Sequence, residues 1–413
     1  MKNINSTPKK INVIFVDSKG ISNIYGIGSY RNNLLAELAK SDSVNLFCVS
    51  IKYADKGSAK ILKIDEENAY TNIEIVLSAN NLKTENLNIN QPRISAYSAN
   101  ICITLIKFLS GCEDGIIHLN ISGEVELCKV AKRLGFNVVA TQHVQVINPQ
   151  INPNDFNSIL LEGEKKFFSL VDEVICLSNY TKSAIINNYS FDSRKVTLIY
   201  NGVKALEPAL NKKSDLKKRF GFSKKDFIFL FVGRIEKSKG LYELIQSFIV
   251  FAKGKSNIKL VVVGGGDVYS ALSFTFENMG NIVFTGFLTG AQLSLVFSLS
   301  DVGVLPSYSE QSSFSVLEMM NNGLPVIVSD IDGFELFENR KHVLKADYVL
   351  GSPGNSNSID TISLTACMEE LFNNVELRSL ISINASKLLA EKLNSVSMSK
   401  NTISVYKRAY NKI

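Results

Sequence analysis

The sequence has few of the patterns that build metal centres, disulfide frameworks or membrane spans. Its three histidines lie far apart, and no clustered histidine, cysteine or carboxylate spacing indicates a metal site. The six cysteines form no CxxC pair, which favours reduced thiols in a cytosolic protein. No uncharged apolar stretch reaches the ~18 residues that span a bilayer, and the short apolar run before Asp17 is not typical of a secretory signal. We expect a cytoplasmic protein whose membrane contact, if any, is peripheral on the inner surface.

A complete dinucleotide-binding fingerprint is also missing. In segment 23–35, Gly26 and Gly28 come directly before an expected helix, but Arg31 stands where a third glycine is required. Glycine lets a backbone approach a ligand, and the amides of a helix N-terminus attract anions. A ligand loop and a plain tight turn both remain open for this segment.

Positive charge is concentrated in one place. Segment 212–225 carries seven basic residues and one acidic residue, while the net charge of the whole chain is only +6. A solvated helix or linker face explains such a cluster best, and contact with an anionic membrane or nucleic acid is the alternative. We expect no nucleic-acid partner.

Short apolar runs alternate with amphipathic stretches in both halves, which is typical of parallel strands covered by helices. The expected strands are 11–17, 115–121, 136–142 and 173–178 in the first half, and 227–233, 258–265, 281–287, 301–307 and 324–330 in the second. At 413 residues, the chain exceeds the roughly 250–300 residues at which one core stops growing. We therefore expect an α/β protein with two doubly wound domains.

The polar, basic stretch between the strand-rich halves marks the domain boundary. We expect a first domain over 1–203 and a second over 204–396, with a last helix that packs on either one. Segments 1–9 and 351–358 have the composition of flexible chain. Ligands of open parallel sheets lie outside the carboxyl ends of the strands, so the loops that follow strands are the candidates for a site.

Two such loops in the second half suit a phosphorylated ligand. Segment 232–240 carries Arg234 and Lys239, two cations that could bind a diphosphate or simply be solvated. The glycines at 264–266 suggest a backbone that approaches a ligand.

The most informative loop is 301–330. Glu310 follows a strand, and Glu318 lies eight residues later in an apolar helix, where an unpaired carboxylate is costly. Carboxylates accept sugar or ribose hydroxyls, and the amides of 312–315 could bind phosphate between them. The alternative is that Glu310 caps the helix and Glu318 forms a surface ion pair.

Several motifs in order resemble the family 4 retaining glycosyltransferases, also called group 1, which have the GT-B fold. The segment from Glu310 to Glu318 resembles their E-x7-E signature, and VGRIEKSKG at 232–240 resembles their phosphate-binding loop. The family pattern also includes segments that resemble LIYNGV, VVVGGGD, FTGF, YGIGSY and VVATQH of this sequence. The resemblance implies two Rossmann-like domains facing across a cleft, with the last helix, 397–413, on the first domain.

The resemblance also implies roles for individual residues. Arg234 and Lys239 would neutralise the donor diphosphate, and Glu318 would bind the ribose. Glu310 would bind hydroxyls of the transferred sugar, and His143 would face the donor sugar or the acceptor. The remaining donor-binding positions are implied to be Gly28, Phe287, Ser313, Phe314 and Ser315.

The chain departs from the family pattern beside these residues. Gln311 and Ser313 replace two usual glycines, Tyr25 replaces a third, and the stretch after the strand at 324–330 is altered at 332–335. These differences leave the donor sugar open. Asp330 and Asp332 form a DxD, which we interpret as coincidence because the family uses no metal. His118 and His342 are expected to be structural or surface residues.

The resulting prediction is a metal-independent, retaining transferase without a cofactor. It would move a hexosyl-type group from a UDP- or GDP-linked sugar to a saccharide, lipid-linked or peptide acceptor. A catalytically silent nucleotide-sugar-binding subunit is the first alternative, because Gln311 and Ser313 are unusual. A nicotinamide-dependent dehydrogenase is the second, and the incomplete fingerprint disfavours it.

Overall fold

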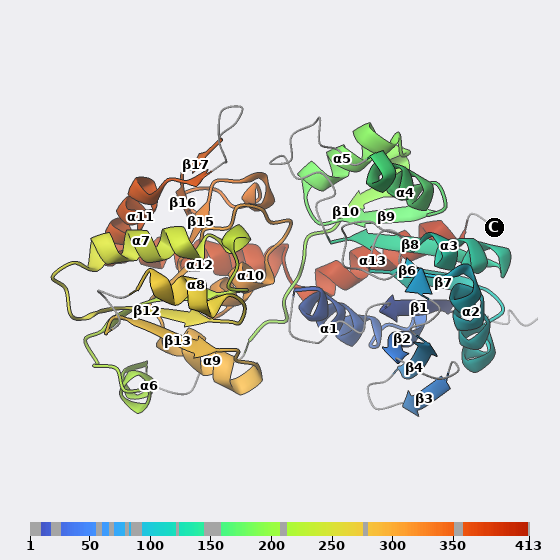
Figure 1. The fold of residues 1–413 in the computed structure, drawn as a ribbon, viewed down its shortest axis with the longest axis horizontal. Coiled ribbons are helices and arrows are strands. Elements are labelled where there is room, and N and C mark those ends of the chain that lie inside the picture. Colours follow the sequence, from blue (N-terminus) through green and yellow to red (C-terminus); the bar gives the residue numbers. More distant parts are fainter. Residues whose placement is uncertain are drawn as a thin grey trace, which may run out of the picture. The chain divides into compact units, whose positions relative to one another are not determined.

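The computed structural model describes residues 10–17, 26–54, 60–65, 70–78, 82–83, 93–120, 124–143, 158–206, 213–275, 280–350 and 358–411. The chain divides into two compact units (Figure 1). Unit 1 comprises Met1–Tyr200 with Ser395–Ile413, and unit 2 comprises Asn201–Asn394. The boundaries expected from the sequence were 203 and 397. Of the expected flexible segments 1–9 and 351–358, all residues except 358 lie outside the described residues.

Unit 1 is built on an eight-stranded sheet in the order β10-β9-β8-β7-β1-β2-β4-β3. All neighbouring strands are parallel except β3 and β4. The strands are β1 (Ile11–Asp17), β2 (Val44–Ala54), β3 (Lys60–Asp65), β4 (Thr71–Ser78), β7 (Gly115–Leu119), β8 (Phe136–Gln142), β9 (Glu173–Cys176) and β10 (Val196–Leu198). The short β5 (Leu82–Lys83) and β6 (Arg93–Ile94) pair separately. The chain adds strands on one side of β1 first and then, from β7 on, on the other side, so the strand order reverses between β1 and β7 as in a doubly wound fold.

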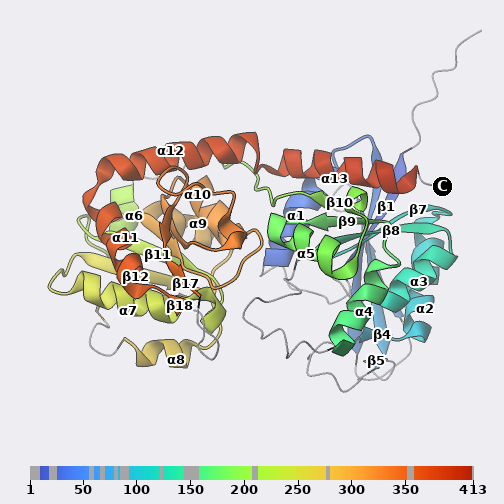
Figure 2. The same cartoon turned by 90° about the horizontal axis from the view of Figure 1, so that it is seen from above.

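Helices cover both faces of this sheet. On one face, α2 (Ala96–Ser110) and α3 (Val125–Arg133) pack over Ile14, Val16 and Ile117. On the other, α1 (Gly26–Leu38) contacts α13 (Ser395–Tyr410), the last helix (Figure 2). The remaining helices of the unit are α4 (Ser158–Phe168) and α5 (Asn179–Tyr189). Unit 1 is therefore built from early and late parts of the chain, because α13 packs on α1 and on strands of the first sheet.

Unit 2 has a six-stranded, all-parallel sheet in the order β13-β12-β11-β14-β15-β16. Its strands are β11 (Phe227–Val232), β12 (Ile258–Val263), β13 (Ile282–Gly286), β14 (Val302–Leu305), β15 (Val326–Ser329) and β16 (Leu344–Ala346). Its helices are α6 (Lys213–Arg219), α7 (Leu241–Ala252), α8 (Val268–Ser273), α9 (Gly290–Leu299), α10 (Phe314–Asn321), α11 (Thr361–Asn373) and α12 (Val375–Glu391). This order reverses between β11 and β14, which is the Rossmann arrangement.

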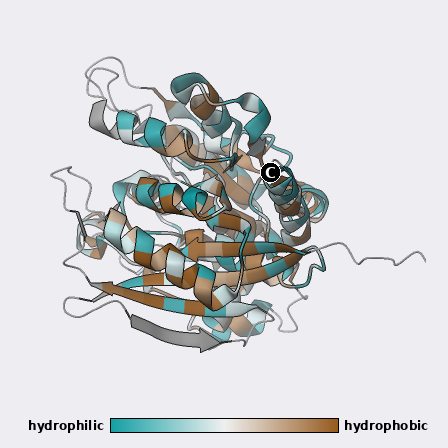
Figure 3. Cartoon of the chain, turned by 90° about the vertical axis from the view of Figure 1, so that its right-hand side faces the viewer, coloured by the Kyte–Doolittle hydropathy of each residue, from teal (hydrophilic) through white to brown (hydrophobic). Residues whose placement is uncertain are grey.

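The predicted α/β class with two Rossmann-like domains is confirmed. Each strand predicted from an apolar run is present, and Figure 3 shows strands largely brown and helices banded in brown and teal. One helix start was predicted wrongly. The helix expected to follow Gly26 and Gly28 begins at Gly26, so both glycines lie in its first turn. Their amides still belong to a helix N-terminus, where backbone N–H groups lack helical partners.

Candidate functional site

Two predicted residues meet at the switch point of the second sheet. The loops after β11 and β14 lie side by side there, because these strands are neighbours. Lys239 Nζ donates to Glu310 Oε1 at 2.7 Å, and both side chains are largely buried. Ser307 Oγ donates to the same oxygen at 2.9 Å. Glu310 is therefore held by a cation and a hydroxyl, while the N-cap position of α10 (Phe314–Asn321) belongs to Ser313.

The two loops are also joined through Tyr308. Its backbone N–H donates to the carbonyl of Ser238 at 2.9 Å, and its hydroxyl donates to Glu243 Oε1 of α7 at 2.7 Å. Burial and the Glu243 carboxylate raise the pKa of Tyr308, so this hydroxyl keeps its proton. The loop that carries Glu310 is thus fixed at both its backbone and its side chains.

The amides predicted to bind phosphate lie at the start of α10. Ser313 is the N-cap residue but its side chain makes no capping bond, so the amides of Phe314 and Ser315 begin the helix. The preceding Ser312 is anchored by Asn201, whose Nδ2 donates to the Ser312 carbonyl at 2.6 Å. The Asn201 backbone N–H also donates to Ser312 Oγ, at 3.2 Å. The segment that enters unit 2 therefore positions the helix N-terminus.

Glu318 lies on α10 and does not form the surface ion pair that was the alternative reading. Within the described residues, its carboxylate has no hydrogen-bond or ion-pair partner, and loss of solvent raises its pKa from 4.5 to about 7. A partly buried carboxylate without a partner is costly in the absence of a ligand. This arrangement fits a group that binds hydroxyls of a ligand.

Arg234 is not part of the Lys239–Glu310 cluster. Its NH2 group pairs with Glu236 Oε1 at 3.0 Å, and its side chain is half exposed. Phe287 follows β13 and is 45% exposed. Both residues nevertheless lie beyond the carboxyl ends of strands of the second sheet.

Two glycine features have a packing explanation. Gly264 has φ +145°, and a Cβ there would lie 1.8 Å from the Gly233 carbonyl oxygen, so this glycine serves the approach of β12 to the neighbouring loop. A Cβ at Gly265 would meet nothing within 4 Å, and the expectation that the run at 264–266 approaches a ligand stays a prediction. In the altered stretch 332–335, a Cβ at Gly333 would lie 2.1 Å from the Glu310 carbonyl oxygen. Gly333 therefore allows the Glu310 loop its position.

The remaining predicted residues, Gly28 and His143, lie in unit 1. Gly28 is buried in the first turn of α1, and His143 directly follows β8. The Tyr30 ring packs edge-on against the His143 ring at 4.6 Å. Burial lowers the pKa of His143 to about 3, so the imidazole is neutral, and its Nε2 is buried without a hydrogen-bond partner.

The other two histidines are structural, as expected. His118 is fully buried; its Nδ1 bonds to the Tyr406 hydroxyl at 2.6 Å and its Nε2 to Thr141 Oγ1 at 2.8 Å. His342 is buried, and its Nδ1 accepts from the Glu338 backbone N–H at 3.2 Å. Sequence reasoning did not reveal the contacts of His118, because Tyr406 and Thr141 lie 288 and 23 residues away from it.

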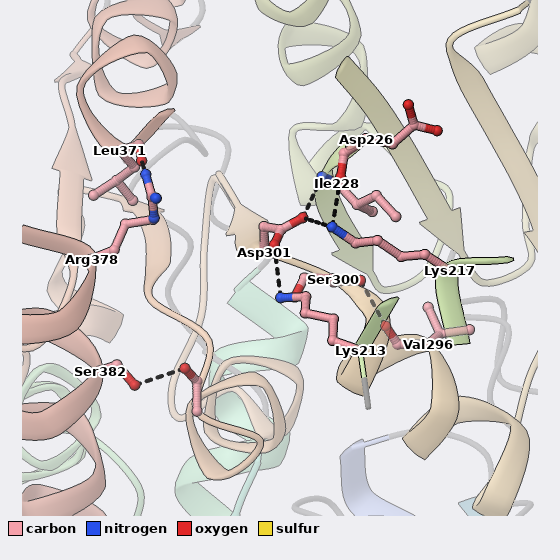
Figure 4. Close-up of polar contacts among 11 residues, drawn as sticks. Lys213, Lys217, Asp226, Ile228, Val296, Ser300, Asp301, Leu371, Arg378 and Ser382 are labelled. Atoms are coloured by element: carbon pink, nitrogen blue, oxygen red, sulfur yellow. Dashed lines mark hydrogen bonds and ion pairs between the residues drawn. The ribbon is translucent and has the colours of Figure 1, made fainter. Parts of the chain in front are cut away.

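The basic cluster is not wholly a solvated face. Lys217 of α6 is 5% exposed, and its Nζ contacts Asp301 Oδ2 at 2.8 Å and the Asp226 carbonyl at 2.6 Å. Lys213 Nζ contacts the other Asp301 oxygen at 2.8 Å (Figure 4). Sequence reasoning missed this because Asp301 lies 84 residues away from Lys217. These lysines fasten α6 to the amino end of β14.

The described part of the chain contains no group of three or more His, Cys, Asp or Glu side chains placed to hold a metal ion. Asp330 of the DxD instead pairs with Lys345 at 2.9 Å. No helix there is long and apolar enough to cross a membrane.

Comparison with protein families gives two matches. The model for glycosyl transferases group 1 matches residues 212–351, and the model for glycosyltransferase family 4 matches residues 92–205. The first match contains the Lys239–Glu310 cluster and Glu318, and the second contains His143. The matched segments lie in the two units and follow each other in the chain.

Individual proteins agree with these matches. An uncharacterised glycosyltransferase of Methanocaldococcus jannaschii is 31% identical over 57% of this chain and 60% of its own length. An Escherichia coli UDP-Gal:α-D-GlcNAc-diphosphoundecaprenol α-1,3-galactosyltransferase is 28% identical over 56% of this chain and 62% of its own. The alignments thus span about three fifths of these two relatives.

Solved structures share the fold across nearly the whole chain. Sucrose-phosphate synthase from Thermosynechococcus elongatus superimposes with a TM-score of 0.73 and 16% identity, covering 98% of this chain and 100% of that one. Anabaena HepE in complex with UDP and glucose gives a TM-score of 0.71 and 16% identity, covering 96% and 99%. At this identity the likeness establishes the GT-B fold alone.

Proposed function

Since this chain belongs to the group 1 glycosyltransferases of family 4, we propose that it transfers a glycosyl group from a nucleoside-diphosphate sugar. The transferred group is of the hexosyl type, and the acceptor is a hydroxyl of a saccharide, lipid-linked or peptide molecule. Transfer retains the configuration at the anomeric carbon and uses no metal ion.

The observation that carries this proposal is the pairing of Lys239 with Glu310 at the switch point of the second sheet, 2.7 Å apart. A diphosphate needs a fixed cation, and a sugar needs a fixed acceptor of hydroxyl protons. Both groups stand beside the N-terminus of α10, whose amides favour negative charge. Glu318 supplies a second carboxylate on the same helix for the ribose hydroxyls.

The proposed reaction breaks the bond between the anomeric carbon and the diphosphate oxygen. The acceptor hydroxyl forms the new bond on the face that the diphosphate leaves, and its proton passes to a phosphate oxygen. Negative charge grows on the diphosphate during this step. That charge is stabilised by Lys239, Arg234 and the amides of Ser313, Phe314 and Ser315. These donors are fixed before the reaction, so they need little reorganisation as the charge grows.

Partners follow from the same proposal. The name of the Escherichia coli relative contains UDP-Gal and a diphosphoundecaprenol acceptor. A UDP-sugar is therefore the first donor to test, with GDP-sugars next. A lipid-linked acceptor would bring the protein to the inner membrane surface as a peripheral protein.

The proposal is tested by measuring nucleoside-diphosphate release from UDP-glucose, UDP-galactose, UDP-N-acetylglucosamine and GDP-mannose. Lys239→Ala and Arg234→Ala should each lower turnover by about 100-fold or more, because each removes a cation from the leaving group. Near-wild-type turnover in both variants would contradict the proposal that Lys239 and Arg234 stabilise the leaving diphosphate. Binding of a donor without turnover by the wild type, with any acceptor, would instead identify a silent binding subunit.

A further inference from the structure

A second switch point lies in the first sheet, between β1 and β7. The chain proceeds through β2 and β4 on one side of β1 and through β8, β9 and β10 on the other side of β7. Ligands of open parallel sheets bind outside the carboxyl ends of the strands at such a point. Val16 pairs with Leu119 there, so the next residues, Asp17 and Asn120, are neighbours at the carboxyl edge.

Asn120 has a polar atom that the described residues leave without a partner. The side chain is 2% exposed, and its Oδ1 accepts no hydrogen bond. A buried amide oxygen without a donor costs free energy, so native structures retain one mainly where a ligand or an ordered water supplies the donor. The position of Asn120 at the switch point favours a ligand.

His143 reaches the same edge on the same face of the sheet. Side chains alternate between the two faces along an extended chain, so residues two apart share a face. Asn120 therefore lies on the same face as His118, and His143 on the same face as Thr141. His118 and Thr141 share a face, because they are hydrogen-bonded at 2.8 Å. The edge therefore presents two unpartnered polar atoms directly after the ends of neighbouring strands, Asn120 Oδ1 after β7 and His143 Nε2 after β8.

The charges at this edge indicate what kind of ligand fits. Asp17, 5% exposed, accepts a hydrogen bond from Arg31 of α1 at 3.0 Å, so these two charges offset each other. His143 is neutral, since burial lowers its pKa. An amide oxygen requires a donor, and a neutral imidazole nitrogen pairs with a hydroxyl in either tautomer. The matching ligand is uncharged and rich in hydroxyl groups.

We propose that Asn120 binds a hydroxyl group of a sugar substrate at the switch point of the first sheet, beside His143. This inference rests on the proposed function and adds a binding residue to it. The hydroxyl belongs either to the transferred sugar or to the acceptor, and the experiment distinguishes these two sources.

The test compares Asn120→Ala with Asn137→Ala in the full chain. Asn137 is a matched control, because it is 8% exposed, its Nδ2 lacks a partner, and it lies at the opposite, amino end of β8. Thermal midpoints are measured together with nucleoside-diphosphate release from the four donors named above. Release is measured with donor alone and with the acceptor that stimulates the wild type most among octyl glucoside, galactoside, mannoside and N-acetylglucosaminide.

We expect Asn120→Ala to lower kcat/KM by about tenfold or more, the equivalent of one lost hydrogen bond. Its thermal midpoint should be unchanged or raised, because an unsatisfied buried group is removed. Asn137→Ala should keep kcat/KM within about twofold, since no ligand contact is lost. If release from donor alone also falls, the hydroxyl belongs to the transferred sugar. If only acceptor-dependent release falls, it belongs to the acceptor.

Wild-type kcat/KM in Asn120→Ala would overturn the inference and leave Oδ1 as the partner of an ordered water. If Asn120→Ala does not fold, Asn120→Ser decides by the same criteria, because its hydroxyl keeps a polar group at this position but does not reach as far as the Asn120 amide. A wild-type chain that releases no nucleoside diphosphate from any donor would instead refute the proposed function.

Discussion

At the scale of single residues, Glu318 links the stability of the free protein to its proposed ligand. Its folded-state pKa of about 7 lies above the ordinary 4.5, because burial disfavours the charged form. Below pH 4.5 the carboxyl is protonated in both states, so it contributes no penalty. As the pH rises from there through about 7, the unfolded chain ionises first and the folded state loses stability.

We therefore predict that Glu318→Gln stabilises the ligand-free protein at alkaline pH. The gain should be about 3 kcal/mol larger at pH ~8 than at pH ~4.5, following from ~1.4 kcal/mol per pKa unit. Urea unfolding of both proteins at the two pH values measures this difference. The same variant should lose donor affinity, because an amide accepts fewer hydroxyl protons than a carboxylate. A gain that is independent of pH would contradict the argument.

Residue identities at the site could be predicted only where a motif carried them. Glu310, Glu318 and Lys239 stand in recognisable spacings, but the Lys239–Glu310 bond joins residues 71 positions apart. Ser307 gave no signal, because a serine in a loop is common and its bond to Glu310 depends on the loop's path. The role of Asn120 could not be predicted either. Asn120 lies beside Asp17 only because β7 pairs with β1, and the sequence does not show that strand order.

At the scale of elements, a buried ion pair between Lys217 and Asp301 contributes to the attachment of α6. Asp301 also accepts from the Ile228 backbone N–H at 2.8 Å, so it connects α6 with the beginnings of β11 and β14. Removing its charge leaves Lys217 buried without a carboxylate. Breaking a buried pair on one side costs more than an exposed pair contributes.

We predict that Asp301→Asn lowers the free energy of unfolding by about 3 kcal/mol. Asp330→Asn serves as the control, because Asp330 forms an ion pair of similar length with Lys345 but is 59% exposed. That change should cost less than about 1 kcal/mol. Urea titration at constant pH measures both, and equal losses would show that burial of the Asp301 carboxylate is unimportant.

Elements were predicted best where the pattern was unambiguous. The buried parallel strands β1, β8 and β11 are short apolar runs bounded by turns, and these positions were identified. Helix α2 was not, because its run of Ile101, Ile103, Thr104 and Ile106 is β-branched and favours strand locally. It is helical because its apolar side packs into the first core, a contact that local preference does not reveal.

At the scale of the whole molecule, the end of the chain completes the unit formed by its beginning. Tyr406 of α13 is fully buried and bonds to His118. Arg408 pairs with Glu173 at 3.2 Å, and Ser395 donates to Glu37 at 3.3 Å. The sequence left the position of the last helix open, and only the family resemblance placed it on the first domain. A helix at the end of the chain does not by itself specify which sheet it packs on.

This organisation predicts that a change in α13 weakens unit 1 selectively. Tyr406→Phe removes the hydroxyl that pairs with His118 Nδ1 at 2.6 Å and leaves that nitrogen buried without a partner, at a cost of about 1–3 kcal/mol. Amide hydrogen exchange should therefore speed up in β7 and β8 and stay unchanged in β11 and β14. Tyr410→Phe is the control on the same helix, because the Tyr410 hydroxyl meets Asp114 outside the core, at 3.2 Å. Its effect should stay within about 0.5 kcal/mol. Faster exchange in both units after Tyr406→Phe would show that the chain opens as one cooperative body instead.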